Sequence, residues 1–262
     1  MKVLLFANTE WYLYNFRRSL ALALRDAGHE VLLVSPPGPY GEKLESLGFR
    51  WVPAPMQRRS LNPFRELSLL MWLRRLIKEN QPDLVHGFTI KSAVYGLLAA
   101  RLAGATGRVG SIAGLGYVFI SGELRARLLR PVVRGLLRLS FGGSNARVIV
   151  QNSDDSNLVE NSLIVERSQI RLICGSGVDC ARFAPVEEDS ELGKAGESVR
   201  VLLASRLLWD KGLREYVDAA RQLLSDGHNA EFLLAGDPDE GNPASVSEHE
   251  VRRWVEEGIL DW

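Results

Sequence analysis

The segment 205–212, which reads Ser-Arg-Leu-Leu-Trp-Asp-Lys-Gly, holds the residues best suited to chemistry. It lies between an apolar run at 199–204 and an amphipathic segment, so we expect it to join a strand to a helix. With Asp210 as the helix N-cap, Arg206 and Lys211 flank a helix N-terminus, where the helix dipole and free backbone N–H groups favour anions. The pattern predicts a diphosphate site, and the alternative is a solvated pair of surface charges.

A second apolar run, at 230–235, predicts a strand next to the first one, and Gly-Asp-Pro follows it at 236–238. Ligands of open α/β sheets bind outside the carboxyl ends of the strands. The turns after both strands should therefore contribute to one site. Besides the two cations, the residues that we expect to bind its ligand are Ser205, Gly212 and Gly236.

The loop after the first predicted strand is polar and aromatic. Its backbone N–H groups could face an anion and its rings the face of a sugar, in which case the contacting residues are Asn8, Thr9, Trp11 and Tyr12. The alternative is a helix cap whose aromatic rings pack in the core.

Two glycines, Gly114 and Gly116, follow another predicted strand and could let the backbone approach a phosphate closely. The third glycine of a dinucleotide-binding motif is missing, because Phe119 stands in its place. The similar glycine pair at 175–177 lacks its third glycine too, since Cys180 stands there. Dinucleotide-dependent oxidoreductases are therefore disfavoured.

The segment 123–141 carries five arginines, one acidic residue and many aliphatic side chains. Helical spacing places four of the arginines on one face, with Pro131 as a kink or a helix start. Such a basic amphipathic helix predicts binding to an anionic membrane surface, and the alternative is an ordinary solvated helix face. Its apolar residues fit helix burial better than base stacking, so no nucleic-acid partner is expected. The four arginines are Arg127, Arg130, Arg134 and Arg138.

The composition is that of a globular protein with a real core: 262 residues, 46% of them hydrophobic and 24% charged. The formal net charge is zero, but it is unevenly distributed along the chain. Residues 1–150 hold 21 Lys and Arg and 9 Asp and Glu, a net charge of +12, whereas residues 151–262 hold 11 and 23, a net charge of −12. This split predicts two regions with different partners.

The two cysteines and four histidines show no disulfide framework and no metal-ligand spacing, so we expect neither a disulfide nor a metal site. The apolar run after Lys2 is too short for a signal peptide, and no stretch reaches the ~18 apolar residues that span a bilayer. We expect a cytoplasmic protein, at most one that sits on a membrane surface.

Short apolar runs alternate with helical patterns, which predicts an α/β fold with a parallel sheet and helices on both faces. The apolar runs do not alternate with polar residues, as expected of strands buried on both faces. We expect strands at 3–7, 31–35, 49–53, 83–87, 108–113, 147–151, 170–174, 199–204 and 230–235. We expect helices at 16–27, 65–78, 92–103, 123–141, 211–224 and 247–257.

These elements predict two Rossmann-like domains. The first comprises residues 1–174, and a linker rich in Gly, Pro and acidic residues follows at 175–198. The second begins at 199 and has room for about two strand–helix units before residue 262, fewer than the ~5 strands of a typical sheet. We expect this second domain to be truncated.

Six stretches of the sequence together resemble glycosyltransferase family 4, whose members have the GT-B architecture of two facing Rossmann-like domains. In chain order, these stretches are 11–17, 83–91, 113–117, 148–152, 175–183 and 205–212. The combination resembles the bacterial branch that adds sugars, often N-acetylhexosamines, to polyprenyl-diphosphate-linked or capsule precursors.

The resemblance implies a retaining enzyme that uses a UDP-sugar and needs no metal or other cofactor. Arg206 and Lys211 match the family's pair of cations that stabilise the departing diphosphate. The first domain would bind the acceptor, a polyprenyl-diphosphate-linked or polysaccharide molecule, and its basic helix would dock on the membrane. The matching residues that would line the cleft from this domain are Asn8, Thr9, Trp11, Tyr12, His86, Lys91, Gly114 and Gly116.

The sequence also departs from the family pattern. Asn8 and Thr9 stand where many relatives have two glycines, and the predicted strand 108–113 lacks the histidine that many relatives carry there. Two other functions therefore stay open. One is an inactive, membrane-associated module that binds acceptor lipid or a partner transferase, and the other is a UDP-sugar epimerase of the same architecture.

Overall fold

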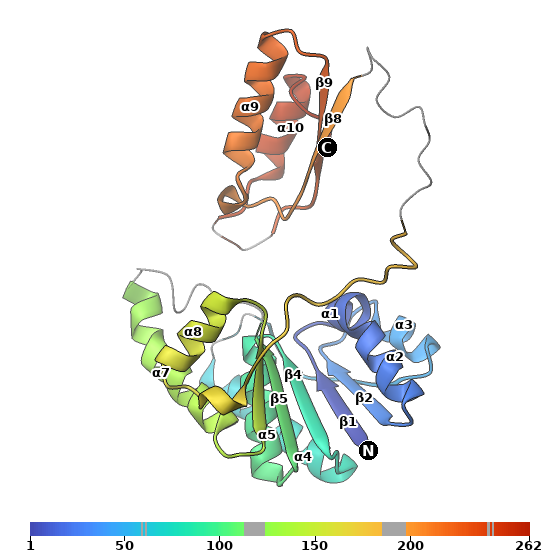
Figure 1. The fold of residues 1–262 in the computed structure, drawn as a ribbon, viewed down its shortest axis with the longest axis vertical. Helices are drawn as coiled ribbons and strands as arrows, with labels where there is room; N and C mark the ends of the chain where they lie inside the picture. The colour runs from blue at the N-terminus through green and yellow to red at the C-terminus, as the bar shows by residue number, and fades with distance from the viewer. Residues whose placement is uncertain (59, 61, 113–123, 185–197, 240–241, 243) are drawn as a thin grey trace. The chain divides into compact units, whose positions relative to one another are not determined.

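A computed structural model describes residues 1–58, 60, 62–112, 124–184, 198–239, 242 and 244–262 (Figure 1). The chain divides into two compact units, Met1–Phe183 and Ala184–Trp262. In the described part of the chain, no helix combines the length and the apolar composition needed to cross a bilayer.

The first unit is built on a parallel sheet of seven strands in the order β3-β2-β1-β4-β5-β6-β7. This confirms the predicted α/β class, and every predicted strand of this unit is present within one or two residues. The strands are β1 (Lys2–Phe6), β2 (Glu30–Ser35), β3 (Arg50–Pro53), β4 (Leu84–Phe88), β5 (Gly107–Ile112), β6 (Ala146–Val150) and β7 (Ile170–Leu172).

Helices cover both faces of this sheet, as the buried apolar strands require. In β1, Leu4 and Phe6 join the core cluster under two helices, α4 (Pro63–Asn80) and α5 (Ile90–Ala103). Val3 and Leu5 point to the opposite face and pack in a second cluster. The helical segments on that side are α1 (Glu10–Tyr12), the π-helix η1 (Leu13–Arg17), α2 (Arg18–Asp26) and α3 (Gly41–Ser46).

A further helix, α7 (Leu124–Phe141), packs beside α5 and buries Leu137 and Phe141 against the strands at the β6 side of the sheet. Pro131 lies inside this helix. Two short elements, α8 (Ser153–Asn161) and the 3-10 turn η2 (Arg167–Gln169), lead from β6 to β7.

The strand order places a switch in direction between β1 and β4. From β1 the chain proceeds to β2 and β3 on one side, and from β4 it proceeds to β5, β6 and β7 on the other. The connections after β1 and β4 therefore leave toward opposite faces of the sheet, which opens a crevice at their carboxyl ends.

The second unit contains two parallel strands, β8 (Val199–Ala204) and β9 (Ala230–Ala235). Its helical elements are the 3-10 turn η3 (Trp209–Lys211), α9 (Leu213–Ser225) and α10 (Glu248–Glu256). Leu213, Val217 and Trp254 bury their side chains in one apolar cluster with Phe232 of β9. Asp261 forms a parallel bridge with Leu233, so the chain runs alongside β9 again at its described end.

The structure corrects two predictions of helices. The helix predicted at 16–27 begins earlier, at Glu10, and is interrupted at Arg17, whose φ of −123° and ψ of 0° are not helical. Gly212, at φ +79°, separates η3 from α9, so the helix predicted at 211 begins at Leu213. The helices α3 and α8 were not predicted, because each is short and lacks a long apolar period.

Candidate functional site

The structure brings Ser205 and Gly236 together at the carboxyl ends of β8 and β9. The amide of Ser205 donates to the carbonyl of Ala235 at 3.0 Å. A Cβ atom on Gly236, whose φ is +156°, would lie 1.8 Å from the carbonyl oxygen of Ser205. This close approach of two backbones admits only glycine.

The prediction that Asp210 caps the helix is wrong. In the 3-10 turn, the amide of Lys211 donates a hydrogen bond to the carbonyl of Leu208 at 3.0 Å, and the amide of Gly212 donates to the carbonyl of Trp209 at 3.3 Å. Gly212 is the N-cap of α9 and supplies no side-chain hydrogen bond to the helix. The first amides of α9 therefore belong to residues 213–215, two positions later than predicted, and no side chain of the N-cap covers them.

The two predicted cations of this segment are in different states. Arg206 forms an ion pair with Asp239, at 3.2 Å between Nη1 and Oδ2, and remains largely exposed. Asp239 is held in place by Asn242, which donates to Oδ2 at 3.1 Å, and by its own amide, which donates to Ser245 at 3.0 Å. Lys211 is exposed and forms no ion pair with any described residue.

Asp239 was not predicted from the sequence, although it lies in the acidic turn that follows Gly236. Its pairing with Arg206 joins residues 33 positions apart. A phosphate that binds Arg206 must compete with this carboxylate, whereas Lys211 is available to it.

The alternative interpretation of the loop after β1, a helix cap, is partly confirmed. Thr9 accepts a hydrogen bond from the amide of Tyr12 at 3.1 Å and so caps α1. Trp11 remains exposed, with its ring edge-on to Phe16 at 5.4 Å between centroids. Asn8 is half-buried at the end of β1. Trp11 thus keeps an exposed ring at the carboxyl edge of the sheet.

His86 lies in β4 and is buried beneath this loop. Its Nε2 lies 2.7 Å from the hydroxyl of Ser111, and its ring stacks 4.1 Å from that of Phe88. Burial, and then the positive charge of Arg17, lower the pKa of His86 to about 3. His86 is therefore a neutral hydrogen-bonding group at physiological pH rather than a proton donor.

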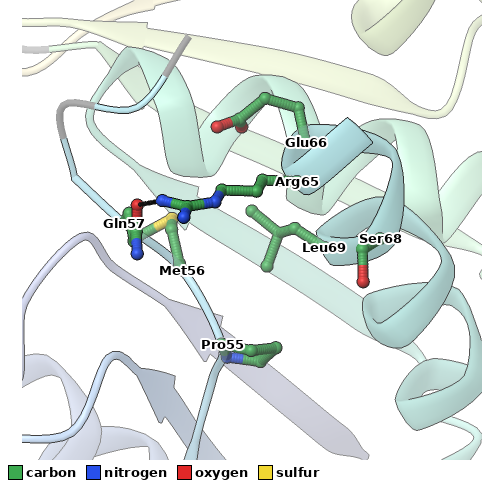
Figure 2. Close-up of a pocket in the computed structure, with 7 residues that line it drawn as sticks. All are labelled: Pro55, Met56, Gln57, Arg65, Glu66, Ser68 and Leu69. Atoms are coloured by element: carbon green, nitrogen blue, oxygen red, sulfur yellow. Dashed lines mark hydrogen bonds between the residues drawn. The ribbon is translucent and has the colours of Figure 1, made fainter. Parts of the chain in front are cut away.

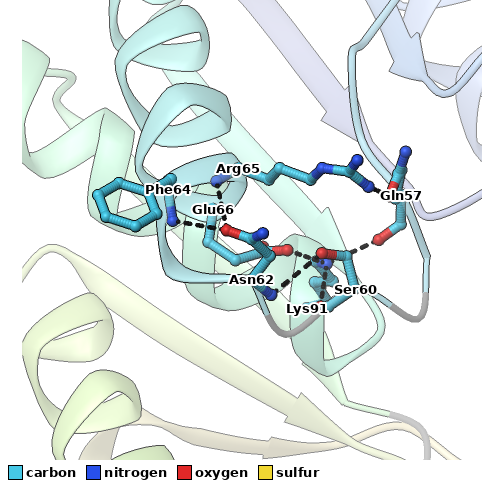
Figure 3. Close-up of polar contacts among 7 residues, drawn as sticks. All are labelled: Gln57, Ser60, Asn62, Phe64, Arg65, Glu66 and Lys91. Atoms are coloured by element: carbon cyan, nitrogen blue, oxygen red, sulfur yellow. Dashed lines mark hydrogen bonds and ion pairs between the residues drawn. The ribbon is translucent and has the colours of Figure 1, made fainter.

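Lys91, near the start of α5, is fully engaged by other parts of the protein (Figure 3). Its ammonium group donates to the carbonyls of Gln57 and Ser60 at 2.7 and 3.0 Å and to Glu66 Oε1 at 2.7 Å. An ammonium group has three N–H bonds, so none is left for a ligand. Burial and the charge of Glu66 also raise the pKa of Tyr95 to about 12.

A cavity of about 270 Å³ lies where the chain after β3 meets α4 (Figure 2). Arg65 donates to Gln57 across it. No sequence pattern predicted this cavity, because its walls come from a loop and a helix that meet only in the fold. Its lining residues are Pro55, Met56, Gln57, Arg65, Glu66, Ser68 and Leu69.

The four arginines predicted to share one face lie on α7. Arg127, Arg134 and Arg138 are exposed and Arg130 is half-buried. Arg138 also donates to the carbonyl of Leu163 at 2.7 Å, which ties α7 to the end of α8.

Exposed apolar residues lie on α4 together with the exposed cations Arg75 and Lys78, and this arrangement was not predicted from the sequence. Phe64, Leu67 and Met71 are 81%, 57% and 50% exposed. Their spacing of three and four places them on one helix face, which continues toward Arg75 and Lys78. An exposed apolar stripe with cations beside it is typical of a helix that lies on a lipid surface.

Two of the predicted residues, Gly114 and Gly116, lie outside the described part of the chain. Among the described residues, no group of three or more His, Cys, Asp or Glu side chains lies close enough to hold a metal ion.

Comparison with protein families decides to which one the chain belongs. The family described as "Glycosyl transferase 4-like" matches residues 2–152, more than half of the chain. The chain belongs to this glycosyl transferase 4-like family. The match covers β1 through β6, and thus the parts of the first unit that carry Asn8, His86 and Lys91.

Two curated relatives of this chain are named for transfer to diphospho-undecaprenol-linked molecules. The N,N'-diacetylbacillosaminyl-diphospho-undecaprenol alpha-1,3-N-acetylgalactosaminyltransferase of Campylobacter jejuni is 31% identical over 242 residues, 90% of this chain and 63% of the relative. The UDP-Gal:alpha-D-GlcNAc-diphosphoundecaprenol alpha-1,3-galactosyltransferase of Escherichia coli is 25% identical over 186 residues, 68% of this chain and 46% of the relative. The chain thus spans 63% and 46% of their lengths.

Solved structures show that the fold of this glycosyl transferase 4-like chain is of the GT-B type. A glycosyltransferase from Rickettsia africae superposes with a TM-score of 0.69 at 18% identity, over 98% of this chain and 65% of that one. The UDP-GlcNAc 2-epimerase from Methanocaldococcus jannaschii superposes with a TM-score of 0.59 at 10% identity, over 99% of this chain and 69% of that one. The fold is therefore shared by transferases and epimerases and does not by itself separate them.

Proposed function

We propose that this protein is a retaining glycosyltransferase that moves a hexose or N-acetylhexosamine from a UDP-sugar to a polyprenyl-diphosphate-linked acceptor. The observation that carries the proposal is the segment 205–212, which presents an exposed cation pair beside the uncapped N-terminus of α9. The two curated relatives, both named for transfer to diphospho-undecaprenol-linked molecules, support the acceptor class.

The chemistry of this segment suits a departing nucleoside diphosphate. As the bond to the sugar breaks, negative charge grows on the terminal phosphate, and preorganised cations lower the barrier. Lys211 would meet this charge directly, and Arg206 would exchange the carboxylate of Asp239 for a phosphate oxygen. Gly236 keeps the backbone of β9 close to Ser205 at this edge. On this proposal neither a metal ion nor another cofactor takes part.

We propose further that the first unit docks on the inner, anionic leaflet of the plasma membrane, where a polyprenyl-linked acceptor is accessible. The basic face of α7 and the apolar stripe of α4 support this location, because the two kinds of side chain bind the headgroups and the acyl boundary of one surface.

A transfer assay with UDP-sugars and a polyprenyl-diphosphate-linked sugar tests the proposal. Replacing Arg206 or Lys211 with Ala should each lower kcat by roughly 10²–10³, as removal of one transition-state donor does in other enzymes. The control is Arg200→Ala, which removes an exposed cation from β8. Wild-type rates in both test variants would contradict the role of the pair, and loss of activity with a chelator would contradict the metal-free mechanism.

The same fold occurs in UDP-N-acetylglucosamine 2-epimerases, so a UDP-sugar epimerase is the second candidate. The same incubation without acceptor distinguishes the two functions. Conversion of one UDP-sugar into its epimer would identify the epimerase. Binding of acceptor lipid with neither reaction would identify a non-catalytic module.

A further inference from the structure

Arg17 is a buried cation without an acidic partner. Its side chain is only 8% exposed, at the end of η1. No carboxylate of a described residue lies within ion-pair distance of it, whereas the half-buried Lys91 has Glu66 and the buried Arg108 donates to the carbonyls of Ser140 and Gly142. Charged side chains that are taken out of water are normally paired, because their desolvation is costly.

The neighbours of Arg17 accept hydrogen bonds from only some of the N–H donors of its guanidinium group. Nη2 donates to the hydroxyl of Tyr12 at 2.6 Å. The guanidinium carbon lies 5.2 Å from the centroid of the Tyr12 ring and 4.7 Å from that of Phe88. Nε is buried and has no hydrogen-bond partner. The rings hold the planar group in position, but they leave donors of its fork unused.

The position of Arg17 is where an open α/β sheet binds ligands. Phe88 is the last residue of β4, which neighbours β1 at the switch in strand direction. The next residue, Thr89, caps the 14-residue helix α5 without a side-chain hydrogen bond, and its own hydroxyl is buried without a partner. A second buried hydroxyl without a partner, that of Ser92, belongs to the first turn of the same helix.

We propose that Arg17 binds a phosphate group of a diphosphate substrate at the carboxyl edge of β4. A phosphate would supply the negative charge that Arg17 lacks and accept from its unused donors. The hydroxyl of Thr89 and the start of α5 belong to the same edge and favour an anion as well. The identity of the diphosphate rests on the proposed function, which offers two sources: the polyprenyl diphosphate of the acceptor and the UDP of the donor.

Calorimetric titration of the whole chain with inorganic pyrophosphate tests the role of Arg17, with Arg206→Ala and Lys211→Ala present in every protein compared so that the site proposed at 205–212 does not contribute. Arg17→Met keeps the length of the side chain and removes the charge, so it should weaken pyrophosphate binding at least tenfold. Arg17→Lys should recover part of the loss, because a point charge returns without the fork. Arg18→Met is the matched control, since Arg18 is the next residue and lies over the ring of Tyr14 instead. Unchanged affinity in Arg17→Met, or no pyrophosphate binding by the chain that keeps Arg17, would overturn the proposal.

A thermal denaturation series separates binding from structural support. If Arg17 serves a ligand, the cost of burying its unpaired charge offsets its contacts with Tyr12 and Phe88 in the free protein, and Arg17→Met should unfold at the same temperature as the wild type or higher. A lower unfolding temperature for Arg17→Met together with unchanged pyrophosphate affinity would show a structural role and overturn the proposal.

Two further titrations identify the source of the phosphate. Loss of affinity for farnesyl diphosphate in Arg17→Met, with UDP binding unchanged, would assign the site to the acceptor lipid. Loss of UDP affinity alone would assign it to the donor. These titrations need no sugar transfer, so a chain that binds pyrophosphate through Arg17 but transfers nothing would uphold the site and refute the transferase.

Discussion

Among the glycines that the structure describes, Gly236 has the least room for a side chain. Its missing Cβ would overlap the carbonyl oxygen of Ser205, and its φ of +156° is one that side-chain-bearing residues rarely adopt. Because the obstacle is backbone, a small rotation of a side chain cannot relieve it.

We predict that Gly236→Ala destabilises the second unit by about 3 kcal/mol, since β8 and β9 must separate to admit a methyl group. Gly227→Ala is the control, because Gly227 also has a positive φ but no atom within 4 Å of its missing Cβ. It should cost about 1 kcal/mol for the left-handed conformation alone. Hydrogen exchange at the amides of β9 measures both, and equal effects would contradict the close approach.

His86 gives the first unit a defined dependence on pH. Its pKa in the folded chain is about 3, against about 6.5 in an unfolded one. Between these values the unfolded chain takes up a proton at His86 and the folded chain does not. The free energy of unfolding should therefore fall by about 1.4 kcal/mol for each pH unit of acidification through this window. Above about pH 6.5 the ring is neutral in both states and contributes nothing to the pH dependence.

Urea denaturation at pH 5 and pH 7 checks this prediction. His86→Gln should lose less stability on acidification than the wild-type chain does. His249→Gln is the control, because His249 is exposed, and it should behave like the wild type. The same pH dependence in all three proteins would show that His86 is not held neutral.

At the scale of elements, the pair of Lys91 and Glu66 joins three parts of the first unit. Lys91 lies on α5 and Glu66 on α4, and the same ammonium group donates to the carbonyls of Gln57 and Ser60 in the chain after β3. Figure 3 shows these contacts converging on one nitrogen. The pair thus fixes the wall of the cavity in Figure 2.

We predict that Glu66→Gln lowers the free energy of unfolding by about 2–3 kcal/mol, because it leaves the half-buried charge of Lys91 without its counter-ion. Glu79→Gln makes the same change on an exposed part of α4 and should cost less than about 0.5 kcal/mol. Urea denaturation of both variants at neutral pH measures the difference. Equal costs would mean that the ion pair does not hold these elements together.

At the scale of the whole molecule, the zero net charge conceals two oppositely charged units. Residues 1–183 hold 24 Lys and Arg and 14 Asp and Glu, a net charge of +10, and residues 184–262 hold 8 and 18, a net charge of −10. An anionic surface should therefore attract the first unit and repel the second.

We predict that the chain binds vesicles of phosphatidylglycerol better than vesicles of phosphatidylcholine, and that raising the salt from about 0.05 to 0.5 M weakens this binding because it screens the arginines of α7. Co-sedimentation measures both effects. Equal binding to both lipids at all salt concentrations would refute the electrostatic contribution.

The apolar stripe of α4 makes a separate contribution that salt does not screen. Replacing Phe64 and Met71 with Ser should lower vesicle binding roughly tenfold or more at both salt concentrations, because two large side chains no longer enter the lipid. Leu223→Ser, an exposed apolar residue of the second unit, is the control and should leave binding unchanged.

The types and order of the elements could be predicted from the sequence because they depend on local patterns. Apolar runs such as 3–7 and 230–235 are strands, and Pro63 marks the start of α4, where Asn62 caps the helix. These signals depend on neighbours within a few residues, which any fold of the chain keeps close together.

Whether each candidate side chain is paired or enclosed depends instead on contacts with residues far away in the sequence. Lys91 was predicted to line a cleft, but Glu66, 25 residues away, engages it. Arg206 was predicted to bind a diphosphate together with Lys211, and Asp239, 33 residues away, pairs with it. Arg17 belongs to the family-like stretch 11–17, but no sequence pattern predicted that Phe88 and Tyr12 enclose it.

By itself, the sequence determined the α/β fold and the family and predicted a diphosphate site at 205–212, since periodicity and motif spacing are local properties. Only the tertiary structure decided which cations are paired and which are left for a ligand. The physical reason is that burial and ion pairing depend on the side chains that other elements bring close, and no local pattern records them.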